Sequence, residues 1–285
     1  MLTMFKLNSG TNTSDLAGRV VAITGAGSGI GRELALLCAQ RGADLALCDI
    51  NDTAVADTAQ TARGFGHDVI TRRVDVSDPE QMTAFADATL GHFGGVDLLV
   101  NNAGVGLIGG FLDTSRKDWD WLVSINVMGV VHGCEAFLPA MIESGRGGHV
   151  VNLSSAAGLL ANPALSAYSA TKFAVLGLSE ALRIELEPHR IGVTAICPGV
   201  INTAITKASP IRGAGDTEGR RQRLTVTYQR RGYTPARAAR NILRAVERNK
   251  AVAPVAAEAH VMYVLSRIMP PLARWVSAQM AKAAK

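Results

Sequence analysis

The feature that most constrains the fold is a buried-strand pattern that runs into a glycine turn and then a helix. Residues 19–24 read Arg-Val-Val-Ala-Ile-Thr, a short apolar run typical of a strand inside a parallel sheet. Glycines follow at 25, 29 and 31, and residues 32–41 continue with helical periodicity. Such a turn lets the backbone approach a pyrophosphate closely, and the helix start favours its negative charge. The alternative is a merely flexible turn, which the flanking strand and helix disfavour.

Apolar strands alternate with helical stretches along most of the chain. We expect strands near residues 19–24, 44–49, 68–74, 96–100, 148–153 and 192–196, with a short seventh near 251–255. This alternation predicts an α/β fold: a doubly wound parallel sheet with helices on both faces and right-handed crossovers. With 285 residues, of which 48% are hydrophobic, the chain can bury this core as one domain.

Ser155, Tyr168 and Lys172 are spaced so that one site could hold a hydroxyl, a phenol and an ammonium. On one helix, Tyr168 and Lys172 would share a face about one turn apart. The ammonium would favour the phenolate and lower the tyrosine pKa from its usual value of about 10, as a general base near neutral pH requires. Alone, this pair is weak, because both residue types are common on exposed helix faces.

Further motifs, in a fixed order along the chain, give that trio its weight. They are Thr24 before the glycines, Asn101-Asn102-Ala103-Gly104, Asn126 in Ser-Ile-Asn-Val, and Pro198-Gly199 near the end of the core. With the Gly-x-x-x-Gly-x-Gly spacing and the trio, the set resembles the short-chain dehydrogenase/reductase family over roughly residues 16–255. The resemblance implies a single Rossmann-fold domain whose seven-stranded sheet has the order 3-2-1-4-5-6-7, with the ligand at the carboxyl ends of the strands.

The resemblance also implies catalytic roles for Asn126, Ser155, Tyr168 and Lys172. Tyr168 would be the general acid or base, and Lys172 would lower its pKa and bind the nicotinamide ribose. Ser155 would hydrogen-bond the substrate oxygen, and Asn126 would hold a water that links Lys172 to solvent. Ser154 is the rival for the serine role, although the thirteen-residue spacing to Tyr168 favours Ser155.

Cofactor-binding positions carry over in the same way. They are Gly25, Ser28, Gly29, Ile30, Gly31, Asp49, Asp75, Val76, Asn102, Ala103, Gly104, Tyr168, Lys172, Pro198, Gly199 and Thr203. Asp75 and Val76 match the adenine-binding pair, although an acid before Ser-Asp-Pro-Glu could equally belong to a helix start. The segment from Pro198 to Thr203 matches the one that lies over the nicotinamide carboxamide.

Asp49 ends the second predicted strand, eighteen residues after Gly31. An acid at about this distance can bind both ribose hydroxyls of NAD, and its charge repels the 2′-phosphate of NADP. We therefore predict NAD as the cofactor and NADP as the less favoured one. The alternative is a solvated acid in the turn that leads into Asn51 and Asp52.

Composition disfavours several other classes of protein. Neither the six histidines nor the four cysteines show metal-ligand spacing, so we predict no metal site and buried, reduced thiols at Cys38, Cys48, Cys134 and Cys197. The chain start lacks a secretion signal, and no apolar run approaches the roughly 18 residues of a spanning helix, so we expect a cytoplasmic protein. Residues 1–15 are predicted to be disordered.

Charge and apolar residues gather in the last third of the chain. Residues 207–250 hold twelve Lys or Arg and three Asp or Glu. A solvated helix and loop is the plain interpretation and an acidic or acyl-carrier-type substrate the sharper one; we expect no nucleic-acid partner, because no aromatic ladder accompanies the charge. The glycine-rich stretch 206–233 corresponds to the family's substrate lid.

Residues 256–285 are predicted to form a C-terminal helical extension of the catalytic domain at 16–255. Apolar residues from Val261 to Val276 make one helical face, interrupted by Pro270-Pro271. This face could cover a hydrophobic substrate channel, pack on a partner subunit or lie on a membrane surface, with packing as the default.

These features predict an oxidoreductase that interconverts a secondary alcohol and a ketone by hydride transfer to or from NAD, with a lipophilic substrate suggested by the apolar tail. The alternatives are an NADPH-dependent ketoacyl reductase and a non-catalytic NAD-sensing interaction protein on the same fold. The family's usual subunit contact, through helices near 116–143 and 166–188, implies a homodimer or homotetramer.

Overall fold

The computed structural model describes residues 16–283, apart from residues 204, 206–207, 214–218, 220–221, 223–225 and 227–231. The predicted disordered start and most of the predicted lid therefore lie outside the described residues. The centre is a seven-stranded sheet in the order β3-β2-β1-β4-β5-β6-β7, and each neighbouring pair of strands is parallel. The strands are β1 (Val20–Thr24), β2 (Asp44–Asp49), β3 (Val69–Arg73), β4 (Leu98–Asn101), β5 (Gly148–Leu153), β6 (Ile191–Pro198) and β7 (Val252–Val255). The predicted fold and strand order are confirmed.

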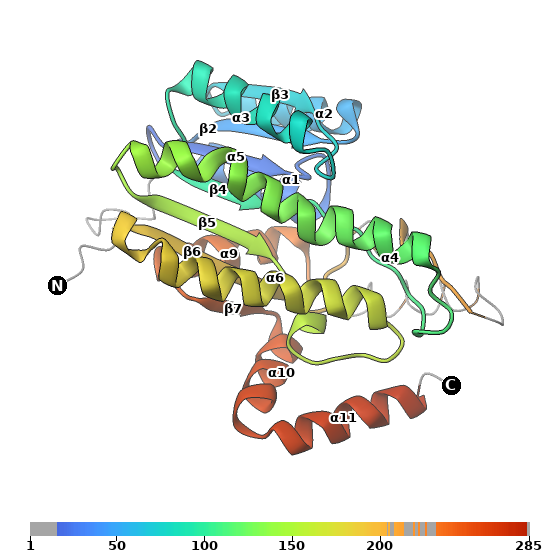
Figure 1. Cartoon of the computed structure of the whole chain (residues 1–285). Helices are drawn as coiled ribbons and strands as arrows, with labels where there is room; N and C mark the ends of the chain where they lie inside the picture. The colour runs from blue at the N-terminus through green and yellow to red at the C-terminus, as the bar shows by residue number, and fades with distance from the viewer. Residues whose placement is uncertain are drawn as a thin grey trace.

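Helices cover both faces of the sheet (Figure 1). One layer holds α1 (Gly29–Gln40), α2 (Asp52–Arg63) and α9 (Pro235–Glu247), and the other holds α3 (Pro79–Phe93), α4 (Arg116–Val123), α5 (Gly129–Glu143) and α6 (Ser166–Glu185). Side chains of β1 alternate between the two layers, with Val21 and Ile23 in one apolar cluster and Val20 and Ala22 in the other. Because both faces are buried, the strand reads as a continuous apolar run.

A buried polar ladder sets the position of α6 against the sheet. The side-chain amide of Asn101 on β4 donates to Asn152 Oδ1 on β5 at 2.9 Å, and the Asn152 amide donates to Ser179 Oγ on α6 at 3.0 Å. Ser179 in turn donates to the carbonyl of Val175 at 2.7 Å. Buried polar groups that find partners favour one arrangement of the elements that carry them, so this ladder fixes the helix that bears Tyr168 and Lys172.

The helical stretch Arg116–Glu143 joins α4, a π-helical turn (Ser124–Met128) and α5. By length and hydropathy it could cross a membrane, although no uninterrupted apolar run suggests this. In the fold, Leu122 and Phe137 are fully buried, and the stretch packs on α3, α6 and β4. We therefore interpret it as a helix of the α/β domain that buries one apolar side in the core, while Val123 and Met128 remain exposed on it.

The C-terminal extension forms two helices, α10 (Ala257–Ile268) and α11 (Pro270–Ala283), which meet where Pro270-Pro271 interrupts the pattern. The α10 helix packs on β7 and on the short turn Ala156–Gly158, whereas α11 lies away from the sheet (Figure 1). Large apolar side chains are exposed along this extension: Val261, Val264, Ile268, Met269, Leu272 and Trp275. The two helices thus differ, because α10 belongs to the body of the domain and α11 projects from it.

Candidate active site

The fold brings Asn126, Tyr168 and Lys172 together near the carboxyl ends of the central strands, and Ser155 follows β5 there. A Cβ atom placed on Gly104, just after β4, would lie 3.0 Å from Asn126 Oδ1 and 3.4 Å from Lys172 Nζ. Lys172 Nζ lies 5.7 Å from the centre of the Tyr168 ring. Tyr168 and Lys172 share one face of α6, as the four-residue spacing predicts.

Lys172 is held as a buried cation at the end of β5. Its ammonium donates to the carbonyl of Leu153 at 2.9 Å, two residues before Ser155. Burial disfavours the charged form and lowers the pKa of Lys172 to about 8. A buried cation is thus fixed on the same helix as the phenol of Tyr168.

The two neighbouring serines have different contacts. Ser154 is buried, and its hydroxyl donates to the carbonyl of Lys172 at 2.7 Å. Ser155 begins the turn Ala156–Gly158, and its Oγ accepts from the amide of Ala157 at 3.1 Å. Among the described contacts the Ser155 hydroxyl acts only as an acceptor, so its proton can be given to a substrate oxygen. Ser154 holds α6 in place, which agrees with the spacing argument for Ser155.

Asn126 lies in the π-helical turn and is completely buried. Its Oδ1 accepts from the amide of Val105 at 2.8 Å, and its Nδ2 donates to the carbonyl of Val105 at 2.9 Å and to Thr171 Oγ1 at 3.2 Å. One side chain thus joins the loop after β4 to α6, beside Lys172. π-Helical turns are common at functional sites because the extra residue redirects a side chain.

The glycine turn is held tightly against the loop after β4. Gly25 has a φ of +66°, and a Cβ on Gly31 would lie 2.2 Å from the carbonyl oxygen of Gly25. Asn102 Nδ2 donates to the carbonyls of Thr24 and Gly25 at 2.9 and 3.0 Å. Thr24 Oγ1 accepts from the amides of Asn102 and Ala103, both at 3.1 Å. Side chains are excluded where a pyrophosphate would approach the start of α1, so the cradle fits a dinucleotide.

Asp49 lies against this turn. Its carboxylate accepts from the amide of Gly27 at 2.8 Å and from the amide of Asn51 at 2.9 Å. A Cβ on Gly27 would lie 2.9 Å from Asp49 Oδ2, so glycine permits this approach. The acid therefore borders the cradle, where a ribose next to the pyrophosphate would lie.

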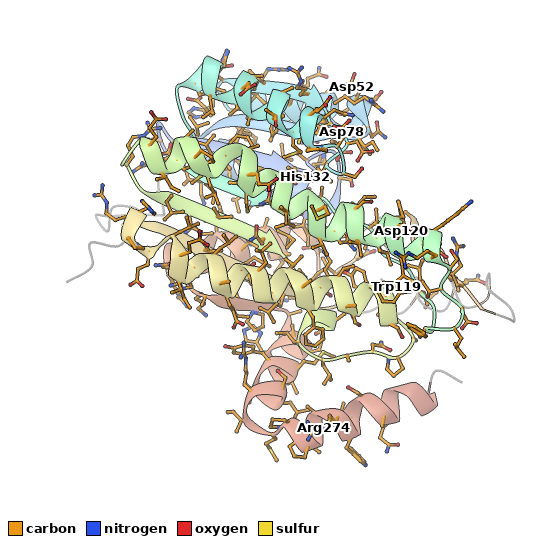
Figure 2. The ribbon with its side chains drawn as sticks, viewed as in Figure 1. Asp52, Asp78, Trp119, Asp120, His132 and Arg274 are labelled. Carbon is orange, nitrogen blue, oxygen red and sulfur yellow. The ribbon has the colours of Figure 1, made fainter. Side chains whose placement is uncertain are left out.

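Asp75 and Val76, the predicted adenine-binding pair, follow β3. Asp75 Oδ1 accepts from the amide and hydroxyl of Ser77 at 3.0 and 2.7 Å, which is local turn chemistry, and the start of α3 is instead capped by Asp78. Figure 2 shows Asp78 near His132 on α5, whose ring contacts the carbonyl of Val76 at 2.9 Å. The structure thus ties Val76 to the helix layer and engages the Asp75 side chain within its own turn.

The segment after β6 reaches the glycine turn. The amide of Gly199 donates to the carbonyl of Val255 at 2.8 Å, which anchors the end of β6 to β7. A Cβ on Gly29 would lie 3.5 Å from the Cβ of Thr203. The segment from Pro198 to Thr203 therefore crosses from the sheet to the start of α1.

Comparison with known proteins decides the family. The sequence model described as short chain dehydrogenase matches residues 19–212. This chain is a short-chain dehydrogenase/reductase. The chain is 41% identical over 260 residues to the oxidoreductase SadH of Mycobacterium tuberculosis, and the match covers 90% of this chain and 92% of SadH. It is also 41% identical over 259 residues to the oxidoreductase EphD of Mycobacterium bovis, of which it spans 44%.

Solved structures agree with this assignment. A short chain dehydrogenase/reductase from Burkholderia phymatum in complex with NAD superposes with a TM-score of 0.83 at 34% identity, covering 90% of this chain and 96% of the other. A short chain dehydrogenase from Mycobacterium paratuberculosis bound to NAD has a TM-score of 0.74 at 29% identity, with 85% and 97% coverage. The solved structures and the sequence relatives therefore place the chain in the same family.

Sequence reasoning missed Glu258, which lies in the first turn of α10. Its Oε1 accepts from the amide of Val200 at 2.7 Å, and glycine at 199 makes room for the carboxylate. On the same helix, Met262 and Tyr263 pack against an apolar cluster that contains Leu159 and Cys197. No local pattern marks an acid fifty-eight residues from its partner, so only the fold reveals that α10 supports the segment after β6.

All four cysteines are buried and outside disulfides, as predicted. Burial raises the pKa of Cys38, Cys134 and Cys197 to about 12, so these thiols are held in the neutral form. Within the described part of the chain, no group of three or more His, Cys, Asp or Glu side chains is placed to hold a metal ion.

The buried ammonium predicts a pH dependence of stability. Because the folded pKa of Lys172 lies below its ordinary value of 10.5, the unfolded chain holds more protons between about pH 8 and 10.5. The contribution of this group to the free energy of unfolding is therefore highest above pH 10.5, where Lys172 is neutral in both states. It decreases as the pH falls to about 8, because protonation of Lys172 favours the unfolded chain. Lys172→Met should become more stable relative to the wild type at pH 8 than at pH 10, by roughly 1–3 kcal/mol. Urea unfolding at both pH values measures this, with the exposed Lys250→Met as control; equal differences for the two variants would refute it.

Proposed function

We propose that this protein is an NAD-dependent oxidoreductase that interconverts a secondary alcohol and a ketone. The observation that carries the proposal is the buried ammonium of Lys172, 5.7 Å from the phenol ring of Tyr168 on the same face of α6. A phenol beside a fixed cation can exchange a proton near neutral pH, which alcohol oxidation and ketone reduction both need.

The chain's own residues supply the proton transfer and the orientation. In the oxidation direction, Tyr168 takes the hydroxyl proton of the substrate and Ser155 donates a hydrogen bond to the same oxygen. Lys172 stabilises the phenolate, and Asn126 holds the loop after β4 beside it. NAD, when bound, supplies the hydride acceptor. The glycine cradle, Thr203 and the Pro198-Gly199 segment would orient it.

The preference for NAD over NADP rests on Asp49. Its carboxylate lies at the turn, 2.8 Å from the amide of Gly27, so a 2′-phosphate at the neighbouring ribose would meet a negative charge. The two related structures named above contain NAD, which agrees with this proposal. NAD preference favours the oxidation direction.

An assay separates the proposal from its alternatives. Purified protein is incubated with NAD or NADP and a panel of secondary alcohols, and with NADH or NADPH and ketones or ketoacyl thioesters, while absorbance of the reduced nicotinamide is followed. We expect turnover of alcohols with NAD. Turnover confined to NADPH and ketoacyl substrates would support the reductase instead, and tight NAD binding without turnover across the panel would support an NAD-sensing protein.

A lipophilic substrate agrees with the surroundings of Tyr168. The phenol packs with a buried cluster that includes Leu107 and Leu122, with Val105 and Trp119 at its edge. Apolar substrate surface placed against such side chains leaves water favourably. Long-chain or polycyclic secondary alcohols therefore belong in the assay panel.

We infer a homo-oligomeric, cytoplasmic protein. Apolar side chains are exposed on the helices that the family uses for subunit contact, namely Val123, Met128, Phe173 and Ile184. Exposed apolar surface of this kind is typical of interfaces. Light scattering of the purified chain measures the oligomeric state, and a monomer at micromolar concentration would contradict the inference.

Two truncations distinguish the roles of the terminal helices. A chain that ends at Met269 lacks α11 and should keep its activity within about twofold, because α11 lies away from the sheet. A chain that ends at Ala256 also loses Glu258 and the packing of α10, so kcat/KM with NAD should fall by about tenfold or more.

Steady-state kinetics of both truncations, with Glu258→Gln in the full chain, test this division. The point variant removes the charge that holds the Val200 amide but leaves the helix in place. Equal activity of the two truncations would show that α10 does not support the cofactor segment.

A further inference from the structure

We propose that Asp118 and Arg212 form an ion-pair latch that positions the substrate-side loops, and so sets substrate affinity in the proposed reaction, on which this role rests. The latch joins α4 to the segment that follows β6. Neither residue belongs to the catalytic or cofactor-binding set, and both are positioning residues.

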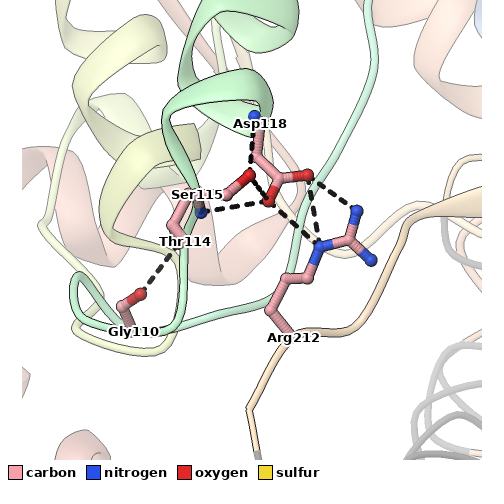
Figure 3. Close-up of polar contacts among 5 residues, drawn as sticks. All are labelled: Gly110, Thr114, Ser115, Asp118 and Arg212. Carbon is pink, nitrogen blue, oxygen red and sulfur yellow. Dashed lines mark hydrogen bonds and ion pairs between the residues drawn. The ribbon is translucent and has the colours of Figure 1, made fainter.

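Both carboxylate oxygens of Asp118 accept hydrogen bonds from Arg212, and one of them also accepts from Ser115 (Figure 3). Arg212 Nη2 donates to Asp118 Oδ1 at 2.7 Å, and Arg212 Nε donates to both carboxylate oxygens at 3.1 and 3.2 Å. Asp118 Oδ2 also accepts from the amide of Ser115 at 3.1 Å and from its hydroxyl at 2.7 Å. The carboxylate is therefore satisfied by a guanidinium fork on one side and a capping box at the start of α4 on the other.

Burial makes this pair different from a surface ion pair. The Asp118 side chain is 9% exposed and that of Arg212 is 42% exposed. On the same helix, Arg116 and Asp120 form a pair whose side chains are 89% and 63% exposed. Exposed pairs contribute little, whereas a buried carboxylate that loses its cation is left poorly compensated. Asp118 therefore binds Arg212 firmly, and Arg116–Asp120 is a natural control.

A short series of backbone hydrogen bonds, here called the ladder, connects three loops. The Asp118–Arg212 ion pair lies at one end of it. The amide of Arg212 donates to the carbonyl of Ile108 at 2.7 Å, and the amide of Ile108 donates to the carbonyl of Pro210 at 2.9 Å. One residue along, the amide of Gly109 donates to the carbonyl of Ala164 at 2.8 Å. The loops after β4, β5 and β6 are thus connected in sequence, and Arg212 holds the outer one.

This ladder borders the catalytic residues directly. Leu165, which pairs with Gly109, is the residue before α6 and lies three positions before Tyr168. At the other end, Val105 is bonded on both sides to Asn126. A Cβ on Gly106 would lie 2.4 Å from Ser209 Oγ, so the segment after β6 passes close over the loop after β4.

Releasing the latch should therefore loosen the substrate side of the site while leaving the proton-transfer groups in place. Tyr168 and Lys172 are held by α6 and by the bond to Leu153, neither of which involves Arg212. The expected effect is on substrate affinity, since displacement of a positioning loop by a fraction of an ångström weakens binding and orientation.

Arg212→Gln, Asp118→Asn and Asp120→Asn, made in the full chain, test the proposal by two readouts. The first readout is amide hydrogen exchange of peptides covering residues 106–110 and 208–213, with NAD present. The second is the steady-state KM and kcat for the best secondary alcohol from the assay panel. Arg212→Lys keeps the charge but cannot form the fork, so it reports on geometry.

For Arg212→Gln and Asp118→Asn we expect exchange in both peptides at least about tenfold faster, KM raised about tenfold and kcat changed by less than about threefold. Arg212→Lys should fall between these variants and the wild type, and Asp120→Asn should match the wild type. In the double variant Asp118→Asn/Arg212→Gln the KM effects should not add, because both changes break one contact.

Unchanged exchange in Arg212→Gln would overturn the latch, whether or not the enzyme turns over the chosen alcohol. Faster exchange with an unchanged KM would overturn its role in substrate binding. A fall in kcat with KM unchanged would likewise contradict it. If the wild-type protein turns over no substrate, the proposed function fails separately, and the exchange of the two peptides still decides whether Arg212 holds the loops.

Discussion

Tyr168→Phe will lower kcat for a secondary alcohol by about 10²- to 10⁴-fold, the range that general acid or base catalysis contributes. The substitution removes one oxygen and keeps the ring, so packing of the phenol against Leu107 and Leu122 is retained. Lys172 also remains bonded to Leu153, and NAD affinity should change by less than about threefold. Stopped-flow or steady-state kinetics measure the rate, and fluorescence titration measures cofactor affinity.

Tyr263→Phe is the matched control for this loss. Tyr263 lies on α10, where its ring packs on an apolar cluster and is approached by Arg267. It lies on another helix than Lys172 and outside the predicted catalytic set, so the control should keep the wild-type rate within about twofold. Retention of more than about a tenth of the wild-type kcat in Tyr168→Phe would mean that another group transfers the proton.

Asp49→Asn will raise kcat/KM with NADP by about tenfold to a hundredfold and lower it with NAD. A unit charge about 4 Å from a phosphate costs roughly 1 kcal/mol in water and about 4 kcal/mol near a protein surface, and 1.4 kcal/mol is a factor of ten. Asparagine keeps one oxygen that can accept from the amide of Gly27, so the turn is perturbed less than by Asp49→Ala. Kinetics with both cofactors at one ionic strength measure the selectivity.

Asp52→Asn controls for charge alone. Asp52 is exposed in the first turn of α2, three residues beyond Asp49 (Figure 2). It carries the same charge but does not contact the glycine turn, so its removal should change the ratio of NADP to NAD efficiency by less than about twofold. Equal ratios for Asp49→Asn and the wild type would refute the role of Asp49 in cofactor choice.

Local chemistry explains why much of the fold is predictable here. Strands β1, β2 and β5 are covered on both faces, so burial forces apolar runs that are visible without any contact information. The glycines at 25 and 31 can likewise be recognised in the sequence. A Cβ at position 31 would lie 2.2 Å from the carbonyl oxygen of Gly25, so only glycine fits there. The spacing of Tyr168 and Lys172 is a property of a single helix.

Contacts between distant segments were not predictable in this way. Glu258 reaches Val200 across fifty-eight residues, and Arg212 reaches Asp118 across ninety-four. The capping pattern at Ser115 and Asp118 marks the start of α4, but nothing in it indicates that the carboxylate also binds a guanidinium. Likewise, helical periodicity shows an apolar tail without showing that α10 packs on the body while α11 projects from it.

By itself, the sequence determined the strands, the glycine turn and the placement of Tyr168 and Lys172 on one helix face, because each depends on residues that are neighbours within one strand, turn or helix turn. Tertiary structure alone decided that the Ser154 hydroxyl binds α6 while Ser155 Oγ accepts from the amide of Ala157, and that Arg212 lies on Asp118. Those outcomes depend on which side chains and backbone groups meet after the chain folds, since a hydrogen bond forms only between groups within about 3 Å, however far apart they are in sequence.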